Sequence, residues 1–275
     1  MNRYTTCLKS VGYQTPGITS QDSKESVTDR QEKVYGFDQS VMNNLRVLQI
    51  GAGGLGGEIA QGLVRKGVGV LKIFDGDNVS LSNLSRQFFY KEDLCKNKAI
   101  CLGNNLIKEC VGKTHIISYP FMFQKSVEDK VDISCDVVIC APDNNEVRIY
   151  ASKLFKDKVP VIFTALDREA STGYVLIQKP KGACFGCVYP NAVADKREPC
   201  PNTSAIIDLV KIIAGFVLFA VDSTVMERKS NWNFRQVFVN GFAPEVVRII
   251  ERKKDCPLCG PIRIGMVAKK RTRKS

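Results

Sequence analysis

Two cysteine pairs in this chain have the spacing of metal ligands. Cys184 and Cys187 form one C-x-x-C pair, and Cys256 and Cys259 form a second one much later in the chain. Four thiolates satisfy tetrahedral Zn²⁺ and leave no open position for catalysis. A redox-active C-x-x-C usually opens a helix of a βαβ unit, and neither pair does so. We therefore predict a structural zinc site that staples the C-terminus to the middle of the chain, with a redox pair or coincidence as alternatives.

A second group of residues has the pattern of a nucleotide site. Gly51, Gly53 and Gly56 form G-x-G-x-x-G in the stretch GAGGLGG, which also contains Gly54. Such glycines allow a tight turn and let backbone amides approach phosphate at a helix N-terminus. Asp75 ends the next apolar run, where an acid typically binds ribose hydroxyls. This much fits NAD as well as ATP.

The polar residues that follow favour ATP. The loop DNVSLSNLSRQ places Asn83, Arg86 and Gln87 just beyond the ribose acid, and Lys98 follows at the start of the next helical pattern. Asp143 ends another apolar run, CDVVICAPD. An arginine, a lysine and an acid that converge on one crevice suit a triphosphate with Mg²⁺ bound by the acid. A nicotinamide ring needs none of them, although each alone could be a surface charge.

The elements that must position these residues alternate along the chain. Apolar runs predict strands at 46–53, 68–75, 115–120, 135–143 and 159–166, and helical patterns lie at 29–44, 55–67, 96–110 and 144–158. Continuous Val/Ile runs bounded by turns are typical of parallel strands that are covered on both faces. The sequence thus predicts a doubly wound, Rossmann-like α/β fold with a mainly parallel sheet. Its ligands are expected at the carboxyl ends of the strands.

The character of the chain changes after Tyr174. A hairpin strand leads into the first cysteine pair, and residues 188–204 form a polar crossover loop of unusual length, which indicates a functional or mobile role. A buried helix at 205–226 and a strand pair near 232–242 complete an antiparallel extension. We expect residues 1–28 to be a flexible arm, 29–260 to be one domain, and 261–275 to be a basic tail.

Composition narrows the possible partners and the compartment. The 275 residues are 44% apolar and carry a net charge of +12. Part of this charge lies in the tail KKRTRKS, which lacks interleaved aromatic residues, so nucleic-acid binding is not expected. We find no membrane span and no secretory signal. Several of the 11 cysteines, such as Cys101 and Cys140, lie inside apparent helices or strands, which favours the reducing cytoplasm.

Taken together, these motifs resemble those of the ubiquitin-activating-enzyme superfamily, specifically the ThiF/MoeB/HesA-type adenylyltransferases. The resemblance covers about residues 29–260. It rests on GAGGLGG, DGDNVSLSNLSRQ, APDNNEVR, the separation of the two C-x-x-C pairs, and DRQ at 29–31. Their combination is far more specific than the glycine pattern alone.

The resemblance implies both an activity and a set of roles. In the family, ATP and the C-terminal carboxylate of a small ubiquitin-like or sulfur-carrier protein form an acyl-adenylate and pyrophosphate. Arg30 in DRQ would complete the site of a partner subunit, which implies a homodimer. The phosphate loop would consist of Gly51, Gly53, Gly54 and Gly56, and the ribose ligand would be Asp75. The phosphate contacts would come from Asn83, Arg86 and Lys98, and the Mg²⁺ ligand would be Asp143.

The chemistry of adenylation agrees with this residue set. A carboxylate with a pKa of about 4 is already ionised at pH 7, so no general base is needed. The only histidine, His115, lies in a strand-like stretch and is expected to be structural. Cys200, beside Lys196 and Arg197, lies near where several relatives carry a cysteine that accepts the activated carboxyl. The family's usual small residues after that cysteine are replaced by PNTSAII, so a spectator thiol is the alternative.

Two other functions stay open at this point. The same chemistry could act on the terminal carboxylate of a short ribosomal peptide during natural-product maturation. The chain could also be a silent scaffold, like the inactive partners in heterodimeric activating enzymes. The presence of Arg30, Arg86, Lys98 and Asp143 argues against a scaffold.

Overall fold

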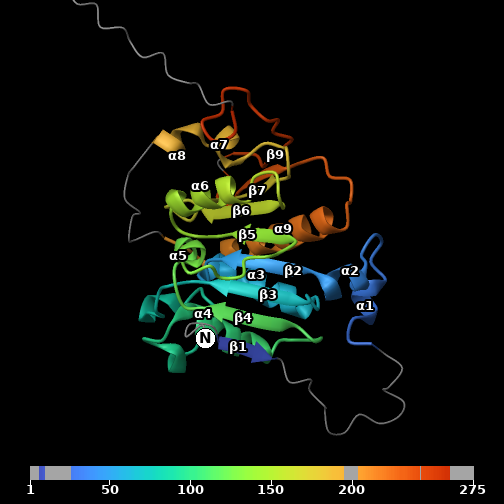
Figure 1. Ribbon diagram of the computed structural model, residues 1–275, viewed down its shortest axis with the longest axis vertical. Coiled ribbons are helices and arrows are strands. Elements are labelled where there is room, and N and C mark those ends of the chain that lie inside the picture. The colour runs from blue at the N-terminus through green and yellow to red at the C-terminus, as the bar shows by residue number, and fades with distance from the viewer. Residues whose placement is uncertain (1–5, 10–25, 195–203, 242, 261–275) are drawn as a thin grey trace, which may run out of the picture.

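A mixed sheet forms the centre of the computed structural model, which describes residues 6–9, 26–194, 204–241 and 243–260 (Figure 1). In this part of the chain its strands follow the order β1-β4-β3-β2-β5-β6-β7-β8-β9. Strands β4, β3, β2, β5 and β6 run parallel to one another, whereas β1, β7, β8 and β9 pair antiparallel. The strands are β1 Thr6–Lys9, β2 Arg46–Ile50, β3 Val70–Phe74, β4 His115–Tyr119, β5 Val137–Cys140, β6 Val161–Leu166, β7 Thr172–Gln178, β8 Phe234–Phe238 and β9 Val246–Arg248.

Helices cover both faces of the parallel strands, as the apolar runs predicted. The core on one face includes side chains of α3, α4 and α9, and the core on the other includes those of α5 and α6. Every residue of β5 is buried, which is the pattern of a strand covered on both sides. The helices are α1 Asp29–Glu32, α2 Gln39–Asn44, α3 Gly54–Arg65, α4 Lys98–Ile107, α5 Phe123–Glu128, α6 Asn145–Leu154, α7 Phe185–Val188, α8 Pro190–Ala194 and α9 Ile207–Val225.

The strand order reverses between β2 and β5. The chain runs outward from β2 through β3 and β4, and then returns to place β5 on the other side of β2. In a doubly wound sheet, a crevice opens at the carboxyl ends of the strands at this switch point. Gly51 follows β2 and Ala141 follows β5, so both lie at that crevice.

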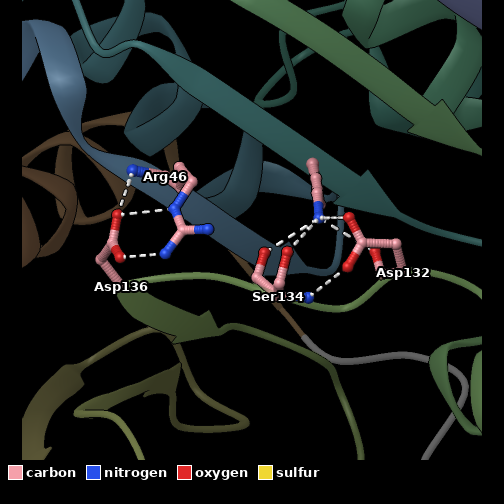
Figure 2. A network of polar contacts seen from close by, with 5 residues as sticks. Arg46, Asp132, Ser134 and Asp136 are labelled. Carbon is pink, nitrogen blue, oxygen red and sulfur yellow. Dashed lines mark hydrogen bonds and ion pairs between the residues drawn. The ribbon is translucent and has the colours of Figure 1, made fainter.

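Two polar networks hold the segment that enters β5 (Figure 2). The guanidinium of Arg46 donates to the carboxylate of Asp136, with one contact of 2.6 Å. Lys72 of β3 is 4% exposed, and its ammonium donates to Asp132 at 2.8 Å and to the Ser134 carbonyl at 2.9 Å. The lysine inside the apolar strand VLKIF is thus compensated by a carboxylate and by neutral acceptors.

The prediction of a single helix at 29–44 is wrong, because the structure contains two helices there, α1 and α2. Gly36 has a φ of +73°, which a helix cannot accommodate, and it separates α1 from α2. Asp38 then caps α2, since its carboxylate accepts the Ser40 amide hydrogen at 2.8 Å.

The C-terminal extension is antiparallel as predicted, but its last strand lies later than expected. β8 falls within 232–242, whereas β9 comes after a connection that contains Gly241 at a φ of +72°. The segment 188–204, expected as loop, contains the short helix α8. Part of the expected N-terminal arm, β1, pairs with β4 at the edge of the sheet.

The longest described helix, α9, packs against α3 and is apolar through most of its length. It carries Asp208, Lys211 and Asp222, as the sequence showed. In the described part of the chain, we find no helix that combines the length and apolarity needed to cross a membrane.

Candidate active site

The glycine loop between β2 and α3 lies against the end of β5. Gly51 has a φ of +102°, and a Cβ atom there would lie 2.6 Å from the Ala141 carbonyl oxygen. A Cβ on Gly56 would lie 2.2 Å from the Gly51 carbonyl oxygen. Both positions therefore require glycine. Gly53 is the N-cap of α3, whose first-turn N–H groups have no helical acceptors and suit an anion.

Asp75 joins this loop from the end of β3. Its carboxylate accepts the amide hydrogens of Ala52 at 2.7 Å and of Asp77 at 2.9 Å. Burial raises the pKa of Asp75, while these two amides and the nearby Lys98 oppose the rise. These two hydrogen bonds hold the side chain beside the glycine loop, in the position expected of a ribose ligand.

The loop with Asn83, Arg86 and Gln87 folds over the start of α3. Asn83 is 7% exposed, and its side-chain oxygen accepts the Ser80 amide hydrogen at 3.0 Å. Its oxygen therefore stabilises the loop, and only its amide nitrogen could donate to a phosphate. A Cβ on Gly54 would lie 3.3 Å from the Arg86 carbonyl oxygen, which shows how closely the loop and the helix meet.

The side chains of Arg86 and Gln87 have capacity left for a ligand. Nη1 of Arg86 donates to the Ser82 carbonyl at 2.6 Å, and within the described residues this arginine forms no ion pair. Oε1 of Gln87 is buried and has no hydrogen-bond partner in the structure. The amide nitrogen of the same side chain lies 4.0 Å from a Cβ placed on Gly53, so it is the group of Gln87 that faces the glycine loop.

Lys98 is the first residue of α4, as predicted, and its ammonium faces Asp77 at 3.0 Å. The lysine side chain is 12% exposed, and the aspartate side chain is 50% exposed. Asn97 ties this helix to β3, because its amide nitrogen donates to the carbonyls of Asp75 and Asp77. To contact a phosphate, Lys98 would have to share or leave its ion pair with Asp77.

Asp143 lies between β5 and α6. Its side chain is exposed and accepts only the amide of Asn144, at 3.2 Å, in the described structure. Asn144 caps α6 through the Val147 amide. The carboxylate of Asp143 therefore stands free at the crevice, where it could bind a cation.

A cavity of about 1100 Å³ opens at the switch point between β2 and β5. Of the predicted site residues, Gly54, Arg86, Gln87 and Asp143 line it. Gly51, Gly53, Asp75 and Asn83 lie in the adjoining loops, and Gly56 and Lys98 lie in the first turns of α3 and α4. These six residues do not form the cavity wall. His115 begins β4 and does not line the cavity either.

Sequence reasoning missed the other half of the cavity wall. Arg148 of α6 lines it, together with the aromatic residues Tyr174, Phe185 and Tyr189. Tyr189 connects the other two, with ring centroids 5.1 Å from Tyr174 and 5.2 Å from Phe185. Arg148 was present in the motif APDNNEVR, but its burial, which is what makes it notable, depends on the fold.

Arg30 does not join this cavity in its own chain. Its side chain is 86% exposed on α1, which lies with α2 beside the amino end of β2 (Figure 1). The cavity lies at the carboxyl ends of the strands. Gln31 fastens α1 to the molecule by donating to the Lys66 carbonyl at 3.2 Å and to Gln39 at 2.6 Å.

The four predicted metal ligands come together in one buried cluster. Sulfur atoms lie 3.8 Å apart between Cys184 and Cys187, 3.5 Å between Cys184 and Cys256, and 3.5 Å between Cys187 and Cys259. A tetrahedron with Zn–S bonds of about 2.3 Å has edges of about 3.8 Å. The cluster therefore fits zinc. Burial raises the pKa of Cys184, so metal binding there must release a proton.

The covalent cysteine predicted at Cys200 lies outside the described residues, as do Lys196 and Arg197. The described chain ends at Ala194 and resumes at Ser204, whose amide donates to the Arg168 carbonyl at 3.2 Å. Ser204 and Ala192 both line the cavity, so the two ends of this segment border it.

Comparison with known proteins identifies the family. The model of the ThiF family matches residues 28–258 of this chain. The chain belongs to the ThiF family. The recognition made from the motifs, of a ThiF/MoeB-type relative of ubiquitin-activating enzymes, is confirmed.

Several characterised members of the family are similar to this chain. The ATP-dependent ubiquitin transferase-like protein Cap2 of Vibrio cholerae is 26% identical over 279 residues, which cover 91% of this chain and 46% of Cap2. The SAMP-activating enzyme E1 of Haloferax volcanii is 24% identical, with 78% of this chain and 80% of that enzyme covered. The adenylyltransferase and sulfurtransferase MOCS3 of Caenorhabditis briggsae is 32% identical, with 64% of this chain and 44% of that MOCS3 covered. The chain thus spans about half the length of Cap2 and MOCS3.

Solved structures share the fold. Escherichia coli MccB, in a crystal structure with ATP, has a TM-score of 0.66 at 18% identity, with 81% of this chain and 68% of MccB covered. PaaA has a TM-score of 0.65 at 20% identity, with 88% of this chain and 77% of PaaA covered. These similarities support the architecture described above.

Proposed function

We propose that this ThiF-family protein uses ATP to adenylate the C-terminal carboxylate of a small ubiquitin-like or sulfur-carrier protein. The observation that carries the proposal is the cavity at the switch point, where the start of α3, Arg86, Gln87 and Asp143 share one wall. A glycine-rich helix start, an unpaired arginine and a free carboxylate are the groups that a metal-bound triphosphate requires.

In this proposal the phosphates of ATP lie against the first turn of α3, and Asp75 binds the ribose hydroxyls. Arg86 neutralises phosphate charge, and the amide nitrogen of Gln87, which faces Gly53, donates a hydrogen bond to the nucleotide. Lys98 turns from Asp77 toward the phosphates, which its partly solvated ion pair permits. Mg²⁺, held by Asp143, would supply further positive charge beside the phosphates.

The reaction needs electrostatic help more than proton transfer. A carboxylate oxygen forms a bond to the α-phosphorus, the bond to the bridging oxygen breaks, and pyrophosphate leaves with that electron pair. The nucleophile is ionised at pH 7 and approaches an anionic centre. Arg86 and Lys98 reduce this repulsion, so the catalytic work lies in positioning and charge stabilisation.

A second copy of the chain would supply Arg30. Because Arg30 lies beside the amino end of β2, whereas its own cavity lies at the carboxyl ends of the strands, we assign it to the site of another molecule. α9 offers a surface for such a homodimer, since Ile212 and Phe219 are apolar and 42% and 45% exposed, respectively. Exposed apolar residues of this size on one helix are typical of interfaces between subunits.

The identity of the substrate rests on the relatives. The SAMP-activating enzyme E1 shares 80% of its length with this chain, and MOCS3 and Cap2 also carry activating or transferase names. This supports a protein substrate. A short ribosomal peptide is the second candidate, supported by the fold shared with MccB, one of whose crystal structures contains MccA. A silent scaffold is disfavoured, because Arg86 and Asp143 line an open cavity.

Cys200 would take over the activated carboxyl after adenylation. Its thiolate would bond to the acyl carbon, and AMP would leave with the electron pair of the C–O bond. The placement of Ala192 and Ser204 on the cavity wall supports a segment that can reach the adenylate. The four-cysteine cluster would hold Zn²⁺ as a structural ion, because four thiolates leave no open position. We place the protein in the cytoplasm, where such thiols stay reduced.

Two experiments test this proposal. A pull-down with the Cys200→Ala protein and ATP identifies the carrier, and exchange of labelled pyrophosphate into ATP then measures adenylation. Asp143→Ala is expected to abolish the exchange, whereas Glu92→Ala, a change of an exposed acid outside the cavity wall, leaves it intact. Exchange at the wild-type rate in Asp143→Ala would refute the metal role. Normal formation of every product by Cys200→Ala would refute the covalent step.

A further inference from the structure

The arginines that line the cavity lack carboxylate partners in the described structure, unlike the buried Lys72 and the partly buried Lys66 elsewhere in the molecule. Lys72 pairs with Asp132 at 2.8 Å (Figure 2), and Lys66 pairs with Asp222 at 2.6 Å. Within the part of the chain that the structure describes, Arg148 forms no ion pair although it is only 7% exposed. An uncompensated buried charge is costly, so its presence at a cavity indicates an anionic ligand.

The hydrogen bonds of Arg148 do not neutralise its charge. Nη1 donates to the side-chain oxygen of Asn145 at 2.8 Å, and Nη2 donates to the Pro142 carbonyl at 2.5 Å. Both acceptors are neutral. The remaining Nε atom is buried and has no partner. The guanidinium is therefore held in place by α6 and the loop before it, while its charge stays available to the cavity.

The acids on the cavity wall do not supply the missing partner. The carboxylate of Asp167 accepts from the Ser171 hydroxyl at 2.7 Å and from the Thr172 amide at 2.9 Å. Asp143 and Glu146 are exposed. In the described structure, none of the three forms an ion pair with Arg148.

Arg148 lies where the aromatic side of the cavity meets the loop after β5, because its Nη2 donates to the Pro142 carbonyl. Burial raises the pKa of Tyr174 and of Tyr189, and the positive charge of Arg148 opposes the rise in both cases. The helix that carries Arg148, α6, also packs against α7 and α8, which flank Tyr189. The backbone of Arg86, by contrast, lies beside the start of α3, where the proposed function places the phosphates.

We propose that Arg148 binds the carboxyl end of the substrate: its terminal carboxylate before the reaction and the acyl carbonyl oxygen of the adenylate afterwards. The cavity then has two anion sites, with Arg86 at the phosphates and Arg148 at the carboxyl group. Tyr174, Phe185 and Tyr189 form an apolar wall around the residue that carries this group. Because Phe185 lies between Cys184 and Cys187, the cysteine cluster fixes this wall. This inference rests on the proposed adenylation.

Binding of two nucleotide probes to the full chain tests the assignment. AMP reports the nucleotide site alone, and glycyl sulfamoyl adenosine, a stable analogue of an acyl-adenylate, adds the acyl group. Calorimetry gives the ratio of the two affinities for each protein. In Arg148→Met we expect the analogue to bind about 10- to 150-fold more weakly, which is the scale for losing one hydrogen bond from a charged donor, while AMP changes by less than about 3-fold.

Lys72→Met is the matched control, since it also removes a buried cation but lies away from the cavity wall. It should lower the melting temperature and leave the affinity ratio unchanged. If Arg148→Met does not fold, Arg148→Lys carries the test: it keeps the charge but shortens its reach, and the ratio should fall about 3- to 10-fold. If a folded Arg148→Met or Arg148→Lys protein keeps the wild-type ratio of analogue affinity to AMP affinity, the proposal is overturned. If the wild-type chain binds neither probe, the nucleotide site itself is refuted, and the inference falls with it.

Discussion

The glycine loop offers the sharpest perturbation of the nucleotide site. In Gly56→Ala, the new Cβ would lie 2.2 Å from the Gly51 carbonyl oxygen, whereas ordinary contacts begin at 3.4 Å. The two atoms must therefore separate by about 1.2 Å. Both are anchored, because Gly51 also lies against Ala141 and Gly56 lies within α3. The separation must come from a shift of the loop that carries the phosphate-binding amides.

The size of the effect follows from this shift. Overpacking costs about 1–3 kcal/mol, of which better helix propensity returns up to about 1 kcal/mol. We expect a net loss of about 1–2 kcal/mol, or a melting temperature about 2–8 °C lower. Loss of one charge-assisted hydrogen bond to phosphate costs about 1.5–3 kcal/mol, so ATP should bind about 10- to 150-fold more weakly.

Calorimetric titration with ATP and thermal unfolding measure both effects. Gly215→Ala is the matched control, because it is also a helical glycine but a Cβ there meets nothing within 4 Å. It should raise stability by about 0.5–1 kcal/mol and leave ATP affinity unchanged. A folded Gly56→Ala protein that binds ATP within about twofold of wild type would show that the loop does not hold the phosphates.

Three further predictions concern the rest of the molecule. Cys256→Ser should lower the zinc content from about one ion per chain and destabilise the fold; equal metal content in both proteins would contradict the four-thiolate site. The Lys72 ammonium lowers the pKa of Asp132 to about 2, so this pair stabilises the fold above about pH 4 and is lost as the pH falls toward 2. Acid unfolding of Asp132→Asn should accordingly be less steep over that window, and an unchanged slope would contradict the pairing. Phe219→Lys should dissociate the proposed homodimer in sedimentation. Arg30→Ala should keep the dimer and lose the proposed adenylation; a monomeric wild-type chain would contradict both expectations.

Local patterns were enough to predict most of the framework. The parallel strands and the helices between them follow from apolar runs and 3.6-residue periodicity, which are properties of each segment alone. Gly51 and Asp75 could be placed because a glycine turn and the end of the next strand meet in any fold of this class. The cysteine cluster was predictable for a similar reason, since spacing and ligand chemistry together define it.

The features that the sequence did not predict fall into two kinds. Some depend on tertiary contacts, and others were visible as local signals in the sequence. The break between α1 and α2 was visible as Gly36 followed by the N-cap Asp38. The lysine inside β3 signalled a buried partner, but only the fold shows that Asp132 supplies it. Arg148 carried no signal in its spacing, because its role comes from burial without a carboxylate.

The most direct test of adenylation asks whether a free C-terminal carboxylate is the group that reacts. Labelled pyrophosphate should exchange into ATP when the wild-type enzyme is given the protein captured by the Cys200→Ala variant. The same captured protein with its C-terminus amidated should support no exchange, because it lacks the nucleophile. Equal exchange with the amidated protein, or exchange with no protein substrate at all, would contradict the proposed function.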